Sequence, residues 1–176
     1  MTQLFYTGVG SRNTPPDALH AIHVLAQRLE QHGYILRTGD ARGADAAFRG
    51  GAFNDQIYTA DYWQSRNPEM TQTWRYNADS WGIAEDLATY LHPAWGNCTS
   101  YARRLLTRNG FQVMGSHMQE RSQFVVCWTP DGVTEGKNTT RATGGTGQTI
   151  RLASHFNIPV FNLNNPDSAA MLWKGI

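Results

Sequence analysis

The sequence predicts an α/β protein, a Rossmann-like three-layer sandwich with a mainly parallel central sheet. Three observations support this fold class. A β-prone run at residues 4–9 is followed by a glycine-rich loop and a helical pattern, and the same order recurs at residues 34–48. An apolar run at residues 124–128 is typical of a strand buried on both faces. The chain has 176 residues, 40% of them hydrophobic, which is enough to bury one core.

The first strand, loop and helix have the clearest pattern. The strand ends in the loop Gly8–Arg12, and Pro15-Pro16-Asp17 then opens a helix. Apolar residues recur in this helix at spacings of three and four until Gly33 stops it: Ala18, Ile22, Leu25, Ala26 and Leu29. A second unit repeats the order, with a strand at Tyr34–Thr38, the loop Gly39–Gly43 and a helix at Ala44–Phe48.

The rest of the chain continues the alternation. Residues 61–81 are polar and aromatic without a clean period, so we expect an excursion over the edge of the sheet. The other elements are expected in this order: a strand at 56–58, helices at 83–91 and 99–106, the buried strand at 124–128, a helix from the loop at 144–149 to residue 155 or 156, a strand at 158–161 and a helix at 167–173. We predict a single domain over residues 1–176.

Charge and composition exclude several function classes. The formal net charge of +1 provides no overall field that would attract a nucleic acid or a membrane. An anionic ligand must therefore be captured locally. The two cysteines, Cys98 and Cys127, form no CxxC pair, and no long apolar run or amino-terminal leader pattern is present. We expect a cytoplasmic protein with no membrane partner.

Three junctions between a strand and a helix are rich in small residues, and they predict a ligand site. The carboxyl ends of parallel strands meet at one edge of a sheet, where backbone amides and helix amino termini favour phosphate. A single glycine loop can be only a tight turn, but three at the same edge favour a shared site. The junctions supply these candidate ligand-binding residues: Gly8, Gly10, Ser11, Arg12, Gly39, Asp40, Arg42, Gly43, Ala44, Asp45, Gly144, Gly145, Thr146, Gly147 and Thr149.

Several of these candidates have a structural alternative. Arg12 can bind phosphate or carboxylate through its guanidinium, and Ser11 can either donate to the ligand or cap the helix. Asp40 or Asp45 can cap a helix beside Arg42, whereas Asp45 can instead hold a ribose hydroxyl. Trp128 and Thr129 end the buried strand at the same edge. There the indole can stack on a base or pack in the core.

The same loops exclude two common nucleotide chemistries. The loop at residues 144–149 lacks the Gly-Lys-Ser/Thr ending of a Walker A motif, and the first loop does not complete GxGxxG because Asn13 stands at its last position. ATP hydrolysis and dinucleotide redox chemistry are therefore disfavoured. The six histidines show no metal-binding spacing, so we predict no metal and no cofactor.

Four segments together resemble the SLOG superfamily, a Rossmann-like group that includes the DNA-processing protein DprA and the LOG phosphoribohydrolases. They are Tyr6–Arg12, Leu36–Phe48, Val125–Pro130 and Gly144–Gly147. The chain is most similar to the small DprA-like members, many of them encoded by phages. This resemblance implies a nucleotide-derived ligand, a homo-oligomer and a sensing or sequestering role such as phage anti-defence.

The resemblance also shows where this chain departs from the enzymes. LOG-type sites use an arginine-lysine pair and a glutamate that follows Gly-Gly-x-Gly-Thr. Here Arg108-Asn109 stands at the pair, Gln148 replaces the threonine, and Arg151 occupies the position of the glutamate. An arginine cannot act as the carboxylate of a glycosidic cleavage. Catalysis therefore stays open, with Asp45, Asp40, Glu120 and Arg108 as weak candidates.

Three functions follow from these residues. The first is binding of a nucleotide or nucleotide-derived phosphate ligand. The second is cleavage or transfer at an N-glycosidic bond of a nucleotide, with Asp45, Asp40 or Glu120 as the carboxylate. The third is single-stranded nucleic-acid binding, as for DprA, through aromatic stacking and the basic residues Arg12, Arg42, Lys137 and Arg141. The near-neutral charge disfavours the third.

Overall fold

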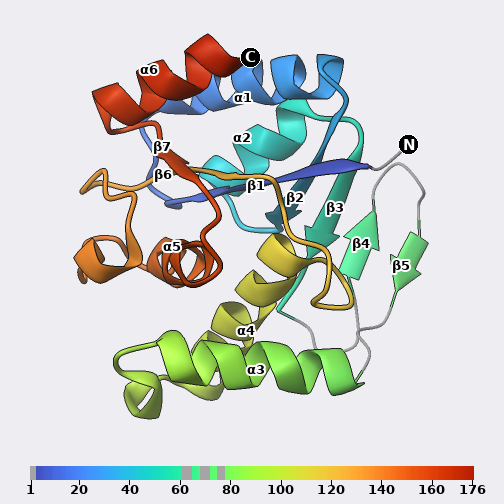
Figure 1. Ribbon diagram of the computed structural model, residues 1–176, viewed down its shortest axis with the longest axis vertical. Coiled ribbons are helices and arrows are strands. Elements are labelled where there is room, and N and C mark those ends of the chain that lie inside the picture. Colours follow the sequence, from blue (N-terminus) through green and yellow to red (C-terminus); the bar gives the residue numbers. More distant parts are fainter. Residues whose placement is uncertain (1–2, 61–64, 68–71, 75–77) are drawn as a thin grey trace.

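The computed structural model describes residues 3–60, 65–67, 72–74 and 78–176, and its fold is a three-layer α/β sandwich (Figure 1). The strands are β1 (Leu4–Gly10), β2 (Tyr34–Gly39), β3 (Asp55–Tyr58), β4 (Ser65–Asn67), β5 (Gln72–Trp74), β6 (Val125–Trp128) and β7 (Val160–Asn162). They form one sheet in the order β5-β4-β3-β2-β1-β6-β7. The five strands from β3 to β7 in that order are all parallel, which confirms the predicted fold class.

Helices cover both faces of the sheet. They are α1 (Pro16–Gln31), α2 (Ala44–Gly51), α3 (Ala78–Leu91), α4 (Ser100–Met114), α5 (Thr146–His155) and α6 (Pro166–Gly175), with short 3-10 turns η1 (Trp95–Asn97) and η2 (Gly136–Asn138). In Figure 1, α1, α2 and α6 lie above the sheet, and α4 and α5 lie below it with α3 outermost. Each helical layer buries its own hydrophobic cluster against the sheet.

The strand order reverses at β1. From β1 the chain proceeds to β2 and β3 on one side, and it later adds β6 and β7 on the other. Tyr6 lies opposite Leu36 on β2, and Val9 lies opposite Cys127 on β6. In open α/β sheets the crevice at such a reversal, outside the carboxyl ends of the strands, is the usual place for a ligand.

Two helices differ most from their predicted extents. α3 begins at Ala78 rather than at residue 83, and α4 continues to Met114 rather than ending at 106. The hydroxyl of Thr99 caps the start of α4, and Gly115 ends it with a φ of +71°. The last two turns of α4 carry buried polar side chains, which interrupt the apolar pattern by which a helix is recognised.

The predicted excursion at residues 61–81 contains the two short strands β4 and β5. Both are antiparallel, and they extend the sheet beyond β3. Residues 61–64, 68–71 and 75–77 of this segment lie outside the described residues. At the other edge, β7 begins at Val160 rather than at residue 158. Within the described ranges, no helix is both long and apolar enough to cross a membrane.

Candidate functional site

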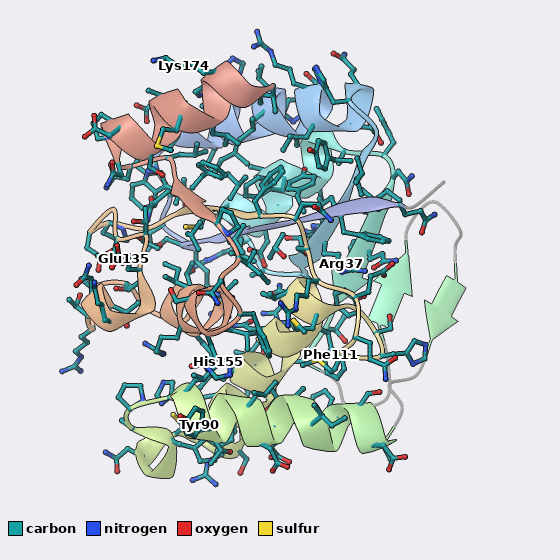
Figure 2. All side chains as sticks on the ribbon, viewed as in Figure 1. Arg37, Tyr90, Phe111, Glu135, His155 and Lys174 are labelled. Atoms are coloured by element: carbon teal, nitrogen blue, oxygen red, sulfur yellow. The ribbon has the colours of Figure 1, made fainter. Side chains whose placement is uncertain are left out.

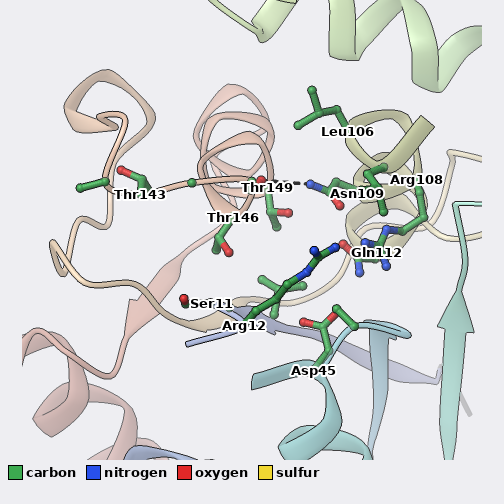
Figure 3. Close-up of a pocket in the computed structure, with 17 residues that line it drawn as sticks. Ser11, Arg12, Asp45, Leu106, Arg108, Asn109, Gln112, Thr143, Thr146 and Thr149 are labelled. Atoms are coloured by element: carbon green, nitrogen blue, oxygen red, sulfur yellow. Dashed lines mark hydrogen bonds between the residues drawn. The ribbon is translucent and has the colours of Figure 1, made fainter. Parts of the chain in front are cut away.

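A cavity of about 370 Å³ lies at the carboxyl ends of the strands where the strand order reverses (Figure 3). The loop after β1, the start of α2, the buried face of α4 and the loop that opens α5 form its walls. The residues that line it are Val9, Gly10, Ser11, Arg12, Ala41, Asp45, Leu105, Leu106, Arg108, Asn109, Gln112, Ala142, Thr143, Gly144, Gly145, Thr146 and Thr149. Its volume lies within the range of small-molecule sites.

The loop after β1 is fixed by its packing against α2 and β6. The Ser11 amide donates to the carbonyl of Trp128 (3.1 Å), and the Ser11 carbonyl accepts from the amide of Ala44 (3.2 Å). A Cβ at Gly10 would lie 2.6 Å from the Cβ of Ala44, so glycine allows this close approach. The Ser11 hydroxyl accepts from the Asn13 amide at 3.1 Å, as in a local turn.

Arg12 is the exposed cation of this loop. Figure 3 shows its side chain extending from the loop across the cavity toward α4, where Gln112 lies. Among the described residues no carboxylate forms an ion pair with Arg12. Its guanidinium is therefore available for an anion that enters the cavity.

The opposite wall is the glycine turn that opens α5. Gly144 has a φ of +66°, whereas Gly145 has helical angles of −61° and −27°. The side-chain amide of Asn109 donates to the Gly145 carbonyl at 3.2 Å and ties the turn to α4 (Figure 3). Apart from the adjacent backbone, no atom of the described residues lies within 4 Å of a Cβ built at Gly145. The start of a ten-residue helix therefore faces open space, and such a helix end attracts anions.

Asp131 holds the loop that leads to this turn. The hydroxyls of Thr129 (2.8 Å), Thr140 (3.0 Å) and Thr143 donate to its carboxylate. Partial burial would raise the pKa of Asp131, but these hydrogen bonds outweigh burial and lower it below the usual value. Thr143 lines the cavity, so the Asp131 carboxylate stabilises the cavity wall that Thr143 forms.

Asp45 and Arg108 lie close together at the base of the cavity, and the Nη1 of Arg108 is 3.8 Å from the carboxylate of Asp40. Asp45 is 4% exposed, and burial raises its pKa to about 6, although Arg108 and the Ala41 amide favour the charged form. The Nη1 of Arg108 donates to the Tyr58 carbonyl at 2.9 Å. A Cβ at Gly39 would collide with both the guanidinium and the Asp45 carboxylate. Glycine at this strand end lets the two groups meet.

Four buried polar atoms at this cavity have no hydrogen-bond partner in the described part of the chain. They are the Nε of Arg108, both amide atoms of Gln112 and the hydroxyl of Thr149. A buried polar group without a partner costs about 1–3 kcal/mol. Such groups gathered at one cavity indicate that something else satisfies them.

The cavity brings together about half of the ligand-binding residues predicted from the glycine loops. Those that line it are Gly10, Ser11, Arg12, Asp45, Gly144, Gly145, Thr146 and Thr149, together with the catalytic candidate Arg108. Asp40 and Arg42 line an adjoining depression of about 290 Å³, which shares Arg12, Leu105 and Arg108 with the cavity.

The other candidates lie outside the cavity lining, where they have packing roles. The absence of a side chain at Gly8 leaves room for the ring of Phe48. Gly43 has a φ of +79°, and it packs closely against the carbonyl of Ser11. Trp128 is 9% exposed and belongs to the core cluster beside α1, α2 and α6, so its packing matches the structural alternative. Three further candidates that do not line the cavity are Ala44, Thr129 and Gly147.

Two residues singled out from the family resemblance also lie away from the cavity lining. The carboxylate of Glu120 pairs with Arg37, a fully buried arginine on β2 that also donates to Gln56 at 2.9 Å (Figure 2). Arg151 donates to Gln148 (3.0 Å) and to the hydroxyl of Thr139 (2.8 Å). Neither residue lines the cavity, so Asp45 is the carboxylate among its described lining residues.

The sequence did not indicate the contribution of α4. Arg108 and Asn109 were noted only through the family resemblance, and Leu105, Leu106 and Gln112 were not selected.

Comparisons with protein-family models, curated proteins and solved structures found no match. The described residues contain no group of three or more His, Cys, Asp or Glu side chains that could hold a metal ion.

Proposed function

We propose that the protein binds a nucleotide or nucleotide-derived phosphate ligand in this cavity. The observation that carries the proposal is the presence of two kinds of group in one cavity. Arg12 and the amino terminus of α5, on opposite walls, suit an anion. The buried polar groups of Asp45, Arg108 and Gln112 suit a polar moiety that both donates and accepts hydrogen bonds. A phosphorylated nucleoside has both parts.

The place of the cavity and the family resemblance support the same proposal. The site lies at the reversal of the strand order, where α/β proteins commonly hold nucleotides. The resemblance to the SLOG superfamily adds a sensing or sequestering role and a homo-oligomer to what we propose. Lys137, one of the basic residues expected for nucleic-acid binding, pairs with Glu135 at 2.8 Å on the surface, away from the cavity lining. A small ligand is therefore favoured over a single-stranded nucleic acid.

Titration calorimetry of inorganic phosphate and nucleoside monophosphates tests the proposal. Replacing Arg12 with Ala removes a charge-assisted hydrogen bond, so we expect affinity to fall roughly 10- to 100-fold. Lys174→Ala is the control, because it removes an exposed cation on α6 and should leave affinity unchanged. No binding of any of these anions by the wild-type protein would refute the proposal.

Asp45 supports a second candidate function, cleavage of an N-glycosidic bond. Its carboxyl group lies in the cavity with a pKa near 6, which suits a group that stabilises positive charge or exchanges a proton at neutral pH. Chromatography would detect free base released from nucleoside monophosphates. Release that disappears in Asp45→Asn would establish turnover, whereas binding without release would leave a sensor or sequestering protein.

A further inference from the structure

The side chain of Gln112 is the least expected feature of the cavity. It lies on α4, it is 1% exposed, and neither its amide nitrogen nor its amide oxygen has a hydrogen-bond partner among the residues that the structure describes. A glutamine buried without partners is destabilising, and an apolar side chain of the same size would avoid that cost. The folded core therefore gives no reason for an amide at this position.

Main-chain hydrogen bonds fix the position of residue 112 beside the cavity. The Gln112 carbonyl accepts hydrogen bonds from the hydroxyls of Thr7 (2.6 Å) and Ser122 (3.3 Å). Thr7 lies on β1, so these bonds hold the helix in register with the sheet. Gln112 is thereby held in the cavity wall, where Arg108 and Thr149 also have polar atoms without a partner in the described part of the chain.

The chemistry of these atoms limits what can satisfy them. The Arg108 Nε can only donate, the Thr149 hydroxyl can donate or accept, and the Gln112 amide presents a donor and an acceptor side by side. The dianion of a phosphate monoester cannot satisfy the amide oxygen, because that atom needs a ligand N–H or O–H group. Phosphate alone is therefore an incomplete ligand for the cavity.

We infer that Gln112 determines specificity by pairing with the edge of a nucleobase. This inference rests on the proposed function and assigns the base to the α4 side of the cavity. A planar amide matches a base edge that has an acceptor next to a donor, as in the pairing of glutamine with adenine. The side chains of Val9, Leu105 and Leu106 line the same cavity and supply apolar surface for the ring. Arg12, which extends toward Gln112, brings the phosphate and the base into one site.

The test compares three probes on the wild-type protein: inorganic phosphate, ribose 5-phosphate and the nucleoside monophosphates. A base contact predicts that the best monophosphate binds at least about tenfold more tightly than ribose 5-phosphate. If phosphate and ribose 5-phosphate bind and no monophosphate binds more tightly, the inference fails while the proposed function stands. If none of the probes binds, the proposed function itself fails.

Gln112→Met adds a readout in the protein. Methionine keeps the side-chain volume but removes both hydrogen-bonding atoms, so the preference over ribose 5-phosphate should vanish while affinity for ribose 5-phosphate is retained. The melting temperature without added ligand should rise, because an unsatisfied buried amide is removed. A purely structural role for Gln112 predicts the reverse, a lower melting temperature with base preference intact.

A second comparison needs no variant. AMP and its analogue without the 6-amino group differ by one donor, and UMP and its N3-methyl derivative differ in the same way. For whichever base binds, loss of this donor should weaken affinity several-fold in the wild-type protein. Equal affinity within both pairs would overturn the assignment of Gln112 to the base edge.

Discussion

Asn109 on α4 donates a hydrogen bond to the carbonyl of Gly145, so a helix of the lower layer holds the glycine turn at the opposite wall of the cavity. The contact joins residues that are 36 positions apart in sequence. Gly144 and Gly145 both line the cavity, but their backbone conformations differ. The two glycines of this turn therefore have separable roles, and substitution distinguishes them.

Gly145→Ala should reduce anion affinity without loss of stability. Gly145 has helical angles and open space around its Cβ, so alanine fits the fold and restricts the unfolded chain, which stabilises by about 0.4–1 kcal/mol. The new methyl group would stand where phosphate approaches the helix end. Gly144→Ala is the matched control, because a φ of +66° makes alanine cost about 1–2 kcal/mol. Thermal shifts at increasing phosphate separate the two effects, and parallel curves for Gly145→Ala and wild type would remove Gly145 from the anion site.

Asp45→Asn should change how stability depends on pH. Burial raises the pKa of Asp45 from 3.8 to about 6, so between these values the folded protein holds a proton that the unfolded chain has lost. The Asp45 contribution to stability is therefore greatest below pH 4 and declines as pH rises through 6. Asparagine removes this contribution. Urea unfolding at pH 4.5 and pH 7.5 measures the free energy of unfolding of both proteins. Relative to wild type, the variant should be more stable at pH 7.5 than at pH 4.5, by about 3 kcal/mol at most. A difference that does not change with pH would show that Asp45 stays charged in the fold.

Asp131→Asn should loosen the loop before α5. Asparagine loses the charge that three threonine hydroxyls stabilise, and the partial exposure of the site limits the cost to about 1 kcal/mol. Because the pKa of Asp131 is lowered, its contribution is present above about pH 4 and is lost as pH falls through the folded-state value. Asp86→Asn, at an exposed position on α3, is the control. Urea unfolding at pH 7 and pH 3 measures both variants, and equal stabilities at pH 7 would contradict the bracing role.

Gly39→Ala tests the close approach of the Asp45 and Arg108 side chains at the end of β2. The added methyl group must displace the guanidinium or the carboxylate, and overpacking of this kind costs about 1–3 kcal/mol. Gly82→Ala is a matched substitution on α3, where the added Cβ meets no atom, and it should stabilise by up to about 1 kcal/mol. Chemical unfolding compares the two. A Gly39→Ala protein as stable as wild type would mean that the pair can rearrange freely.

Local sequence patterns were sufficient to predict the main strands and helices of the fold. The strand before Gly10, the helix that Pro15-Pro16-Asp17 opens and the buried strand expected at 124–128 were predicted because their apolar spacing agrees with their secondary structure. The end of α4 was missed because its inward face is polar. Asn109 and Gln112 are buried there, yet in sequence they read as an exposed segment.

Local sequence patterns also could not predict which way the side chains at the end of β6 point. A strand that is buried on both faces gives no alternation, so sequence could not decide whether Trp128 meets the core or the cavity. The orphaned atoms of Arg108, Gln112 and Thr149 likewise depend on the packing of α4 against α5. Leu106 and Val113, which are seven residues apart and so lie on one helix face, were the available indication, after Thr99 as a cap, that α4 continues.

The hydrogen bond from Ser11 to Trp128 has a long sequence separation, because it joins the loop after β1 to β6, which lies more than a hundred residues later in the chain. Contacts of such long sequence separation form late and slow the folding of a chain. The cavity depends on them, so a partly folded intermediate that contains only the amino-terminal half would lack α4, α5 and β6. Recovery of ligand binding during refolding should therefore coincide with the final cooperative step, after the earlier gain of helical signal.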